Sequence, residues 1–145
     1  MADAYEMETE ECRALLSAGV VGRIAVTTPQ GPYVFPVNYS VVDDAIVMRA
    51  SPYSLLGTNA PDSVVAFEID QFDYEYQRGW SVLARGRCEV VPPQEQEHIR
   101  EVWAPRPWAS GARPLFLRLP WSELTGRRLG TGWDPQAQAP VRRAL

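Results

Sequence analysis

Strict alternation of apolar and polar side chains, in three separate stretches, most constrains how this chain can fold. In Gly22 to Thr28, residues 22, 24 and 26 share one face and residues 23, 25 and 27 share the other. The same period of two recurs in Ser63 to Asp70 and in Trp80 to Val91. Each stretch is predicted to be a β-strand with one buried face, because successive strand side chains point to opposite sides. Gly86, inside the longest stretch, predicts a bend or bulge.

The other predicted elements are short and are separated by turn residues. Pro36 interrupts one strand, so it needs an edge position, a bulge or a place without a ladder partner. Further strands are predicted at Tyr33 to Val42, Ala45 to Arg49 and Leu115 to Leu119. A polar loop is predicted at Gln71 to Gly79, and helices at Gln94 to Trp103, at Tyr53 to Asn59 and from Thr9, as the N-cap, to Gly19.

About six strands with two or three short helices indicate a mainly β fold. No strand–helix–strand rhythm repeats, which argues against a doubly wound parallel sheet. A small antiparallel β-barrel with peripheral helices is predicted, since closure removes exposed strand edges. The 145 residues fit one hydrophobic core. We therefore assign residues 1–130 to a single barrel domain and predict that residues 131–145 form a flexible tail.

The ionisable residues exclude several chemistries. The chain contains no lysine, which excludes Schiff-base and lysine-nucleophile mechanisms. A net charge of −4 argues against non-specific nucleic-acid binding, which normally needs a basic surface. Cys12, Cys88 and His98 cannot assemble a zinc site, and no metal is expected. The acidic start is not a signal peptide and no apolar run could span a bilayer, so we expect a cytoplasmic protein without membrane partners.

The segment from Arg49 to Leu56 follows a short apolar strand and leads into a predicted helix. It brings an arginine, two serines and a tyrosine to the point where the strand ends. The free N–H groups of a helix N-terminus bind anions, and an arginine adds a permanently charged fork. The segment therefore predicts either a phosphate site or an ordinary strand-to-helix connection, which is common in compact domains.

Taken in order, several short motifs resemble one family. They are Gly22-Arg23-Ile24-Ala25-Val26, Gly31-Pro32-Tyr33-Val34-Phe35-Pro36-Val37-Asn38-Tyr39, Val65-Ala66-Phe67-Glu68-Ile69-Asp70, Gly79-Trp80-Ser81-Val82, Arg85-Gly86-Arg87 and Leu124-Thr125-Gly126-Arg127-Arg128. This set spans roughly residues 9 to 130. It resembles the pyridoxamine 5′-phosphate oxidase-like flavoproteins, which have the FMN-binding split barrel fold.

The resemblance implies a homodimer that binds FMN at the subunit interface and transfers hydride to or from a small organic substrate through the flavin. Such chemistry belongs to the cofactor, which suits a sequence without a visible catalytic constellation. The implied phosphate contacts lie on the strand-to-helix segment, at Arg49, Ser51, Ser54 and Leu55. The implied ring contacts are Pro36, Val37 and Asn38 on one strand and Trp80, Ser81 and Val82 on another.

Leu55 departs from the pattern, because relatives usually carry a lysine there. Two alternatives stay open: a deazaflavin-dependent reductase using the same groove, which the absence of lysine disfavours, and a non-catalytic protein that binds a flavin or another small molecule, which it favours. Two site residues also have two interpretations each. Trp80 belongs either to the barrel core or to the wall beside the flavin, and Asn38 either faces the ligand or occupies a turn or bulge.

Overall fold

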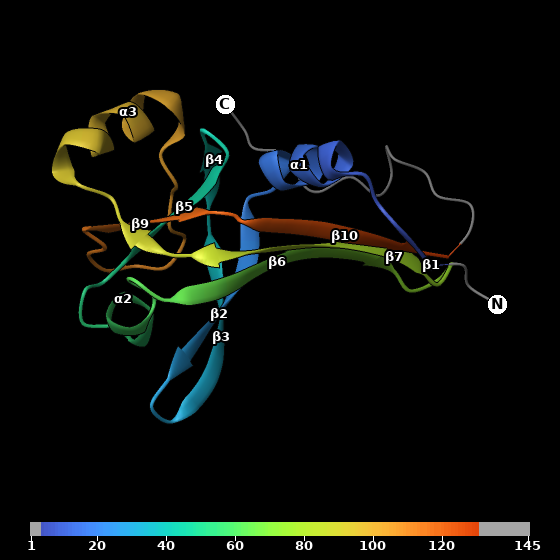
Figure 1. Ribbon diagram of the computed structural model, residues 1–145, viewed down its shortest axis with the longest axis horizontal. Helices are drawn as coiled ribbons and strands as arrows, with labels where there is room; N and C mark the ends of the chain where they lie inside the picture. The colour runs from blue at the N-terminus through green and yellow to red at the C-terminus, as the bar shows by residue number, and fades with distance from the viewer. Residues whose placement is uncertain (1–3, 131–145) are drawn as a thin grey trace.

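The computed structural model describes residues 4–130, which form two antiparallel sheets (Figure 1). The larger sheet has the strand order β1-β10-β7-β6-β2-β3, and the smaller sheet has the order β4-β5-β9-β8. The strands are β1 (Ala4–Glu6), β2 (Val21–Thr28), β3 (Gly31–Asn38), β4 (Ser40–Val42), β5 (Ala45–Ala50), β6 (Val64–Asp73), β7 (Arg78–Arg87), β8 (Glu89–Val90), β9 (Leu115–Pro120) and β10 (Glu123–Leu129). The helices are α1 (Thr9–Ala18), α2 (Leu55–Asn59) and α3 (Pro93–Trp103).

The chain passes from one sheet to the other at short breaks between consecutive strands. Tyr39 separates β3 from β4, and Cys88 separates β7 from β8. Each of the two longest predicted strands therefore bends and contributes to both sheets. No bulge occurs at Gly86, which pairs with Val65 in an uninterrupted β6–β7 register, and the break lies two residues later, at Cys88. The glycine instead permits close packing, since a Cβ there would lie 2.6 Å from the Pro120 carbonyl oxygen. The mainly β, antiparallel fold is confirmed, with ten strands among the described residues in place of about six.

The main core lies between the sheets and under α1. Phe67 and Tyr39 meet edge to face at 4.8 Å, and the Tyr39 hydroxyl donates to the Leu16 carbonyl of α1 at 2.6 Å. Gly126 lets α1 approach β10, because a Cβ there would lie 2.6 Å from the Cys12 sulfur. A second, smaller core lies between the small sheet and α3, formed by Val42, Val47, Val91, Ile99 and Phe116.

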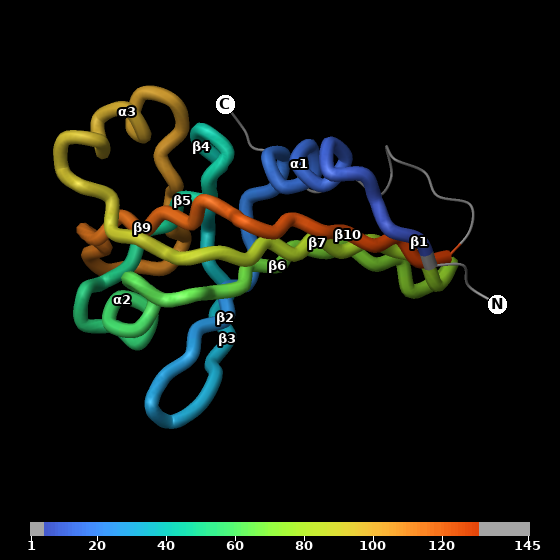
Figure 2. The backbone as a smooth tube through the Cα atoms, viewed as in Figure 1, coloured from blue at the N-terminus to red at the C-terminus, as the bar shows by residue number. Residues whose placement is uncertain are grey.

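The opposite face of the large sheet, here called the outer face, is covered by no described element. Directly paired strand residues point to the same side, so the register defines this face. Its side chains are half-buried or exposed and include Arg23, Ala25, Ala66, Glu68, Asp70, Ser81, Leu83, Arg85, Thr125 and Arg127. Strand β3 forms one edge of the sheet, which confirms the edge position predicted for Pro36. The β2–β3 hairpin extends away from the rest of the molecule (Figure 2).

Several local predictions were wrong. Thr9 is the first residue of α1 and not its cap, which is Glu8 without a side-chain bond. The loop predicted at 71–79 is only a tight turn, because β6 and β7 stay paired as far as Asp73 and Arg78. The Asp73 carboxylate accepts from two backbone N–H groups of this turn at 3.1 Å. The predicted flexible tail, residues 131–145, lies outside the described residues. None of the described helices is long and apolar enough to cross a bilayer.

Candidate functional site

The strand-to-helix segment folds as an N-capped turn. The Ser54 hydroxyl donates to the Ser51 carbonyl at 2.7 Å and accepts from the Gly57 N–H at 3.0 Å. A hydroxyl has one proton, so Ser54 has none left for a phosphate. The Ser51 hydroxyl accepts only a long bond, 3.4 Å, from the Tyr53 N–H. Of the two serines predicted to contact a phosphate, only Ser51 therefore remains a candidate, because the Ser54 hydroxyl stabilises the start of α2.

Helix α2 has only five residues, so its N-terminus is a weak anion site. Leu55 opens the helix with 42 % of its surface exposed, while Leu56 is packed in the core. Exposed Leu55 adds no charge where the family pattern has a lysine. Positive charge for a phosphate must therefore come from another element of the fold.

Arg49 supplies such a charge, but it points toward α3. It lies opposite Phe116 in the β5–β9 ladder, and its guanidinium carbon is 5.0 Å from the centre of that ring. Its Nε donates to the Arg113 carbonyl at 3.0 Å. The residue is half-buried, so its orientation is fixed by packing and by one hydrogen bond. The remaining N–H groups of the fork stay available for a ligand.

The predicted ring contacts divide between the two faces of the large sheet. Pro36, Asn38 and Ser81 lie on the outer face. Val37, Trp80 and Val82 lie on the inner face, and Trp80 is only 1 % exposed. Of the two interpretations of Trp80, the core interpretation is therefore correct for its side chain. The outer-face residues remain as candidates for direct side-chain contact with a ligand.

Asn38 carries the clearest sign of a missing partner. Its Oδ1 accepts from the Trp108 N–H at 2.8 Å, whereas its buried Nδ2 has no hydrogen-bond partner within the described chain. A buried, unsatisfied amide costs about 1–3 kcal/mol, so a native structure normally supplies an acceptor. A flavin ring has carbonyl oxygens and ring nitrogens at its polar edge that could accept this bond. The end of β3 therefore fits such a group.

The loop between α3 and β9 connects the two halves of the candidate site. It is fixed to Asn38 through Trp108 and to Arg49 through Arg113. The Trp108 side chain is 75 % exposed. From the sequence, this loop is Pro/Trp-rich, and an exposed aromatic such as Trp108 could line a substrate pocket or pack against a dimer partner. Its role could be found only from the structure, since Trp108 and Asn38 are 70 positions apart.

A charged cluster lies on the outer face beside Pro36 and Ser81. One nitrogen of Arg23 donates to Glu68 at 2.9 Å and to Asp70 at 3.0 Å. Burial and the neighbouring Asp70 carboxyl raise the pKa of Glu68 to about 7, against the opposing charge of Arg23. The Glu68 carboxyl is therefore partly protonated close to neutral pH. Pro36 pairs with Arg23 and Ser81 pairs with Asp70 across the strands, so the cluster adjoins two predicted ring contacts.

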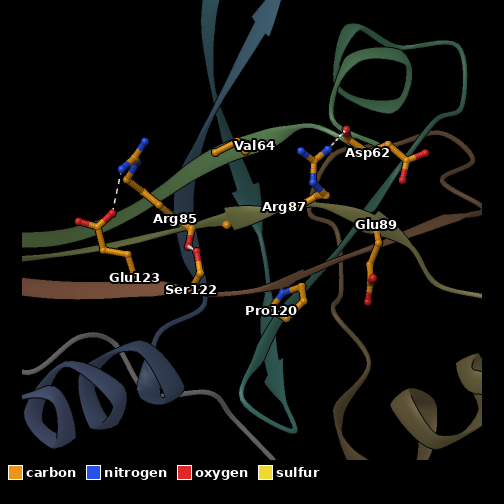
Figure 3. A pocket seen from close by; sticks show the side chains of 9 residues that line it. Asp62, Val64, Arg85, Arg87, Glu89, Pro120, Ser122 and Glu123 are labelled. Atoms are coloured by element: carbon orange, nitrogen blue, oxygen red, sulfur yellow. Dashed lines mark hydrogen bonds and ion pairs between the residues drawn. The ribbon is translucent and has the colours of Figure 1, made fainter.

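A pocket of about 480 Å³ opens at the other end of the outer face (Figure 3). It is lined by Asp62, Val64, Arg85, Gly86, Arg87, Glu89, Pro120, Ser122 and Glu123, none of which is a predicted site residue. Its lining includes three carboxylates and two arginines, of which Arg85 is paired with Glu123 at 2.8 Å, while Glu89 is paired with Arg118 at 2.7 Å. This balance disfavours a phosphate there, so Asn38 and Arg49 remain the candidate ligand contacts.

Metal-dependent and thiol-dependent chemistry find no support among the described residues. No group of three His, Cys, Asp or Glu side chains within residues 4–130 could hold a metal ion. Both cysteines are buried and unpaired, and burial raises the pKa of the Cys88 thiol to about 12. A thiol that stays protonated is a poor nucleophile. Chemistry at this site would therefore depend on a bound group.

Most of the chain resembles known proteins. Residues 8–128 match the family model described as pyridoxamine 5′-phosphate oxidase. An uncharacterized protein of Mycobacterium tuberculosis is 28 % identical over 133 residues, which cover 88 % of this chain and 86 % of that protein.

Two solved structures share the fold. The FAD binding protein of Mycobacterium smegmatis has a TM-score of 0.67 and 25 % identity, covering 87 % of this chain and 98 % of that one. A conserved protein of unknown function from Corynebacterium diphtheriae has a TM-score of 0.69 and 26 % identity, covering 86 % and 96 %. Each match spans more than four-fifths of this chain, so the likeness extends to nearly all of the described fold.

Proposed function

The chain belongs to the pyridoxamine 5′-phosphate oxidase family, and we propose that it is a flavoprotein that binds its cofactor at the end of β3. The observation that carries this proposal is the Asn38 side-chain amide, which is buried and lacks an acceptor within the described residues. Asn38 would donate to the polar edge of the flavin ring. Pro36, on the same edge strand, leaves that stretch of β3 without a backbone donor of its own.

The cofactor we propose first is FMN. Bound flavin supplies the hydride chemistry, so the protein needs only to hold the ring, exclude water and position a small organic substrate. Arg49 would face the phosphate, with Ser51 as a neutral contact nearby. FAD is the second candidate, because the M. smegmatis relative at 25 % identity binds FAD.

We further propose that the protein acts in the cytoplasm as a homodimer formed through the outer face. This face is open and mixes apolar with charged groups, and Val34 and Val64 on it are 62 % and 52 % exposed. A two-fold dimer would bury both and enclose the end of β3. The Glu68 carboxyl would then lie near the interface, beside the ring contacts.

Titration of the purified protein with FMN, FAD and riboflavin, followed by flavin fluorescence, tests the proposal. Asn38→Ala should weaken all three ligands about tenfold, since each contains the same ring. The matched control is Asn59→Ala, because Asn59 is the chain's other asparagine and bonds only within and around α2. Wild-type protein that binds none of the three at high micromolar concentration would refute the flavoprotein assignment.

Activity is tested separately on the loaded protein. Reduction of the bound flavin by NAD(P)H or by a reduced deazaflavin, followed as loss of its visible absorbance, would support an oxidoreductase. Tight binding without reduction by either donor would instead support a protein that stores or carries the flavin.

A further inference from the structure

The pocket at the end of the outer face away from Asn38 has walls that backbone hydrogen bonds fix in place (Figure 3). The Asp62 N–H donates to the Cys88 carbonyl at 2.8 Å, and the Cys88 N–H donates to the Ser63 carbonyl at 2.8 Å. On the side of β10, the Ser122 N–H donates to the backbone of β7 at 2.9 Å. The pocket volume of about 480 Å³ lies in the range of small-molecule sites, about 300–1,000 Å³. The pocket is therefore preformed and large enough for a small ligand.

Two of the five charged side chains that line the pocket, Arg87 and Asp62, have no ion-pair partner among the described residues. The other three already belong to the two ion pairs of this pocket. One Arg87 nitrogen donates to the backbone carbonyl of Asp62, and the Asp62 carboxylate extends away from the guanidinium (Figure 3). The other Arg87 N–H groups and the Asp62 carboxylate therefore remain available to a ligand within the described chain.

An apolar wall lies beside the Arg87 side chain. Val64 pairs directly with Arg87 across β6 and β7, so the two side chains lie on the same face, and Val64 is 52 % exposed. Pro120 adds a second apolar group to the lining. A ligand that bonds Arg87 can therefore bury an apolar group against Val64, which removes apolar surface from water. Val64 also lies on the face proposed for the dimer, so the pocket adjoins that interface.

We propose that this pocket binds a small zwitterion with an apolar tail, the chemical class of the aliphatic amino acids. The carboxylate of the ligand would bond the planar Arg87 fork through two oxygens, and its ammonium group would bond the Asp62 carboxylate. A simple anion or a simple cation would leave one of these two pocket charges unpaired, whereas a zwitterion offsets both. The site uses none of the proposed flavin contacts, so the inference goes beyond the proposed function and does not depend on it.

A simpler interpretation is that Arg87 and Asp62 are solvated surface charges, since both residues are exposed. Three probes with the same branched tail separate the two interpretations: L-leucine carries both charges, isocaproate only the carboxylate, and isoamylamine only the ammonium group. Binding is measured by calorimetry on the full chain at constant ionic strength. Wild-type protein should bind L-leucine about tenfold more tightly than either singly charged probe. Equal affinities for the three probes, or no binding of L-leucine at millimolar concentration, would overturn the site.

Substitution of each charge should affect only the probes that contact it. Arg87→Met keeps an apolar stem and removes the fork, so it should weaken L-leucine and isocaproate about tenfold and leave isoamylamine unchanged. Asp62→Asn should weaken L-leucine and isoamylamine instead. Asparagine suits this position because Asp62 has a left-handed backbone conformation, with a φ of 59°. An Arg87→Met protein that binds L-leucine as tightly as wild type would refute the contact between Arg87 and the carboxylate.

The matched controls are Arg106→Met and Glu97→Gln, at exposed residues that do not line the pocket. Each changes the net charge as its pocket counterpart does, so both should bind all three probes like wild type. Arg87→Met also removes the bond to the Asp62 carbonyl, so Arg87→Lys, which retains the charge, is measured beside it. The lysine variant should recover part of the lost L-leucine affinity. If both Arg87 variants weaken all three probes equally, the loss comes from a changed pocket shape and the inference fails.

Discussion

The two faces of the large sheet share one backbone but have different roles. The inner face is closed by α1 and the small sheet, and residues such as Phe67 and Val82 are 1 % exposed. The outer face carries Pro36, Asn38 and the Glu68 cluster, and no described helix or strand covers it, although the loop before β9 reaches it at Asn38 through the Trp108 N–H. The inner face therefore determines whether the chain folds, whereas the outer face is available for a partner or a cofactor.

The largest predicted effect is a difference in unfolding free energy between two alanine substitutions, one of a large apolar side chain on each face of the sheet. Phe67→Ala removes a ring that contacts Tyr39 in the core and should lower the free energy of unfolding by about 3–5 kcal/mol. Leu83 lies on the adjacent strand but on the outer face, so Leu83→Ala should lower the unfolding free energy by about 1 kcal/mol or less. Urea unfolding measures both, and equal losses would show that the faces do not differ in this way.

A charge introduced on the outer face should disrupt the proposed dimer without unfolding the protomer. Leu83→Arg would place two like charges at a two-fold interface, so the dimer should dissociate while each protomer stays folded. Sedimentation gives the mass, and circular dichroism checks the fold. Glu97→Arg, on the exposed side of α3, is the control and should leave the mass unchanged. A Leu83→Arg protein that remains dimeric would move the interface elsewhere.

A substitution at Ser54 distinguishes its predicted role as a phosphate contact from its role as the N-cap of α2. Because its hydroxyl caps α2 at Gly57, Ser54→Ala should cost about 1 kcal/mol of unfolding free energy. The affinity ratio between FMN and riboflavin should not change, since the hydroxyl proton is already donated to Ser51. A selective loss of FMN would instead show that Ser54 contacts the phosphate.

Sequence reasoning succeeded where one local pattern determines the outcome. Alternation identified the inner face, and Pro36 identified an edge strand. It missed β10, because Gly126 interrupts the apolar alternation and the reason for that glycine is contact with α1. It also missed the contact between Arg49 and Phe116, since the two residues lie on strands far apart in the sequence and only tertiary pairing brings them together.

The smallest predicted effect is a pH dependence of the unfolding free energy that comes from Glu68 on the outer face. Burial and Asp70 raise the pKa of folded Glu68 to about 7, from an unfolded value of about 4.5. The folded state then binds more protons between these values, so the unfolding free energy should fall as pH rises from about 4.5 to above 7. The Glu68 side chain is 36 % exposed, so solvent screening reduces the effect to on the order of 1 kcal/mol. Urea unfolding of wild type and Glu68→Gln across this range measures it, and an unchanged pH slope in the variant would rule out Glu68 as its source.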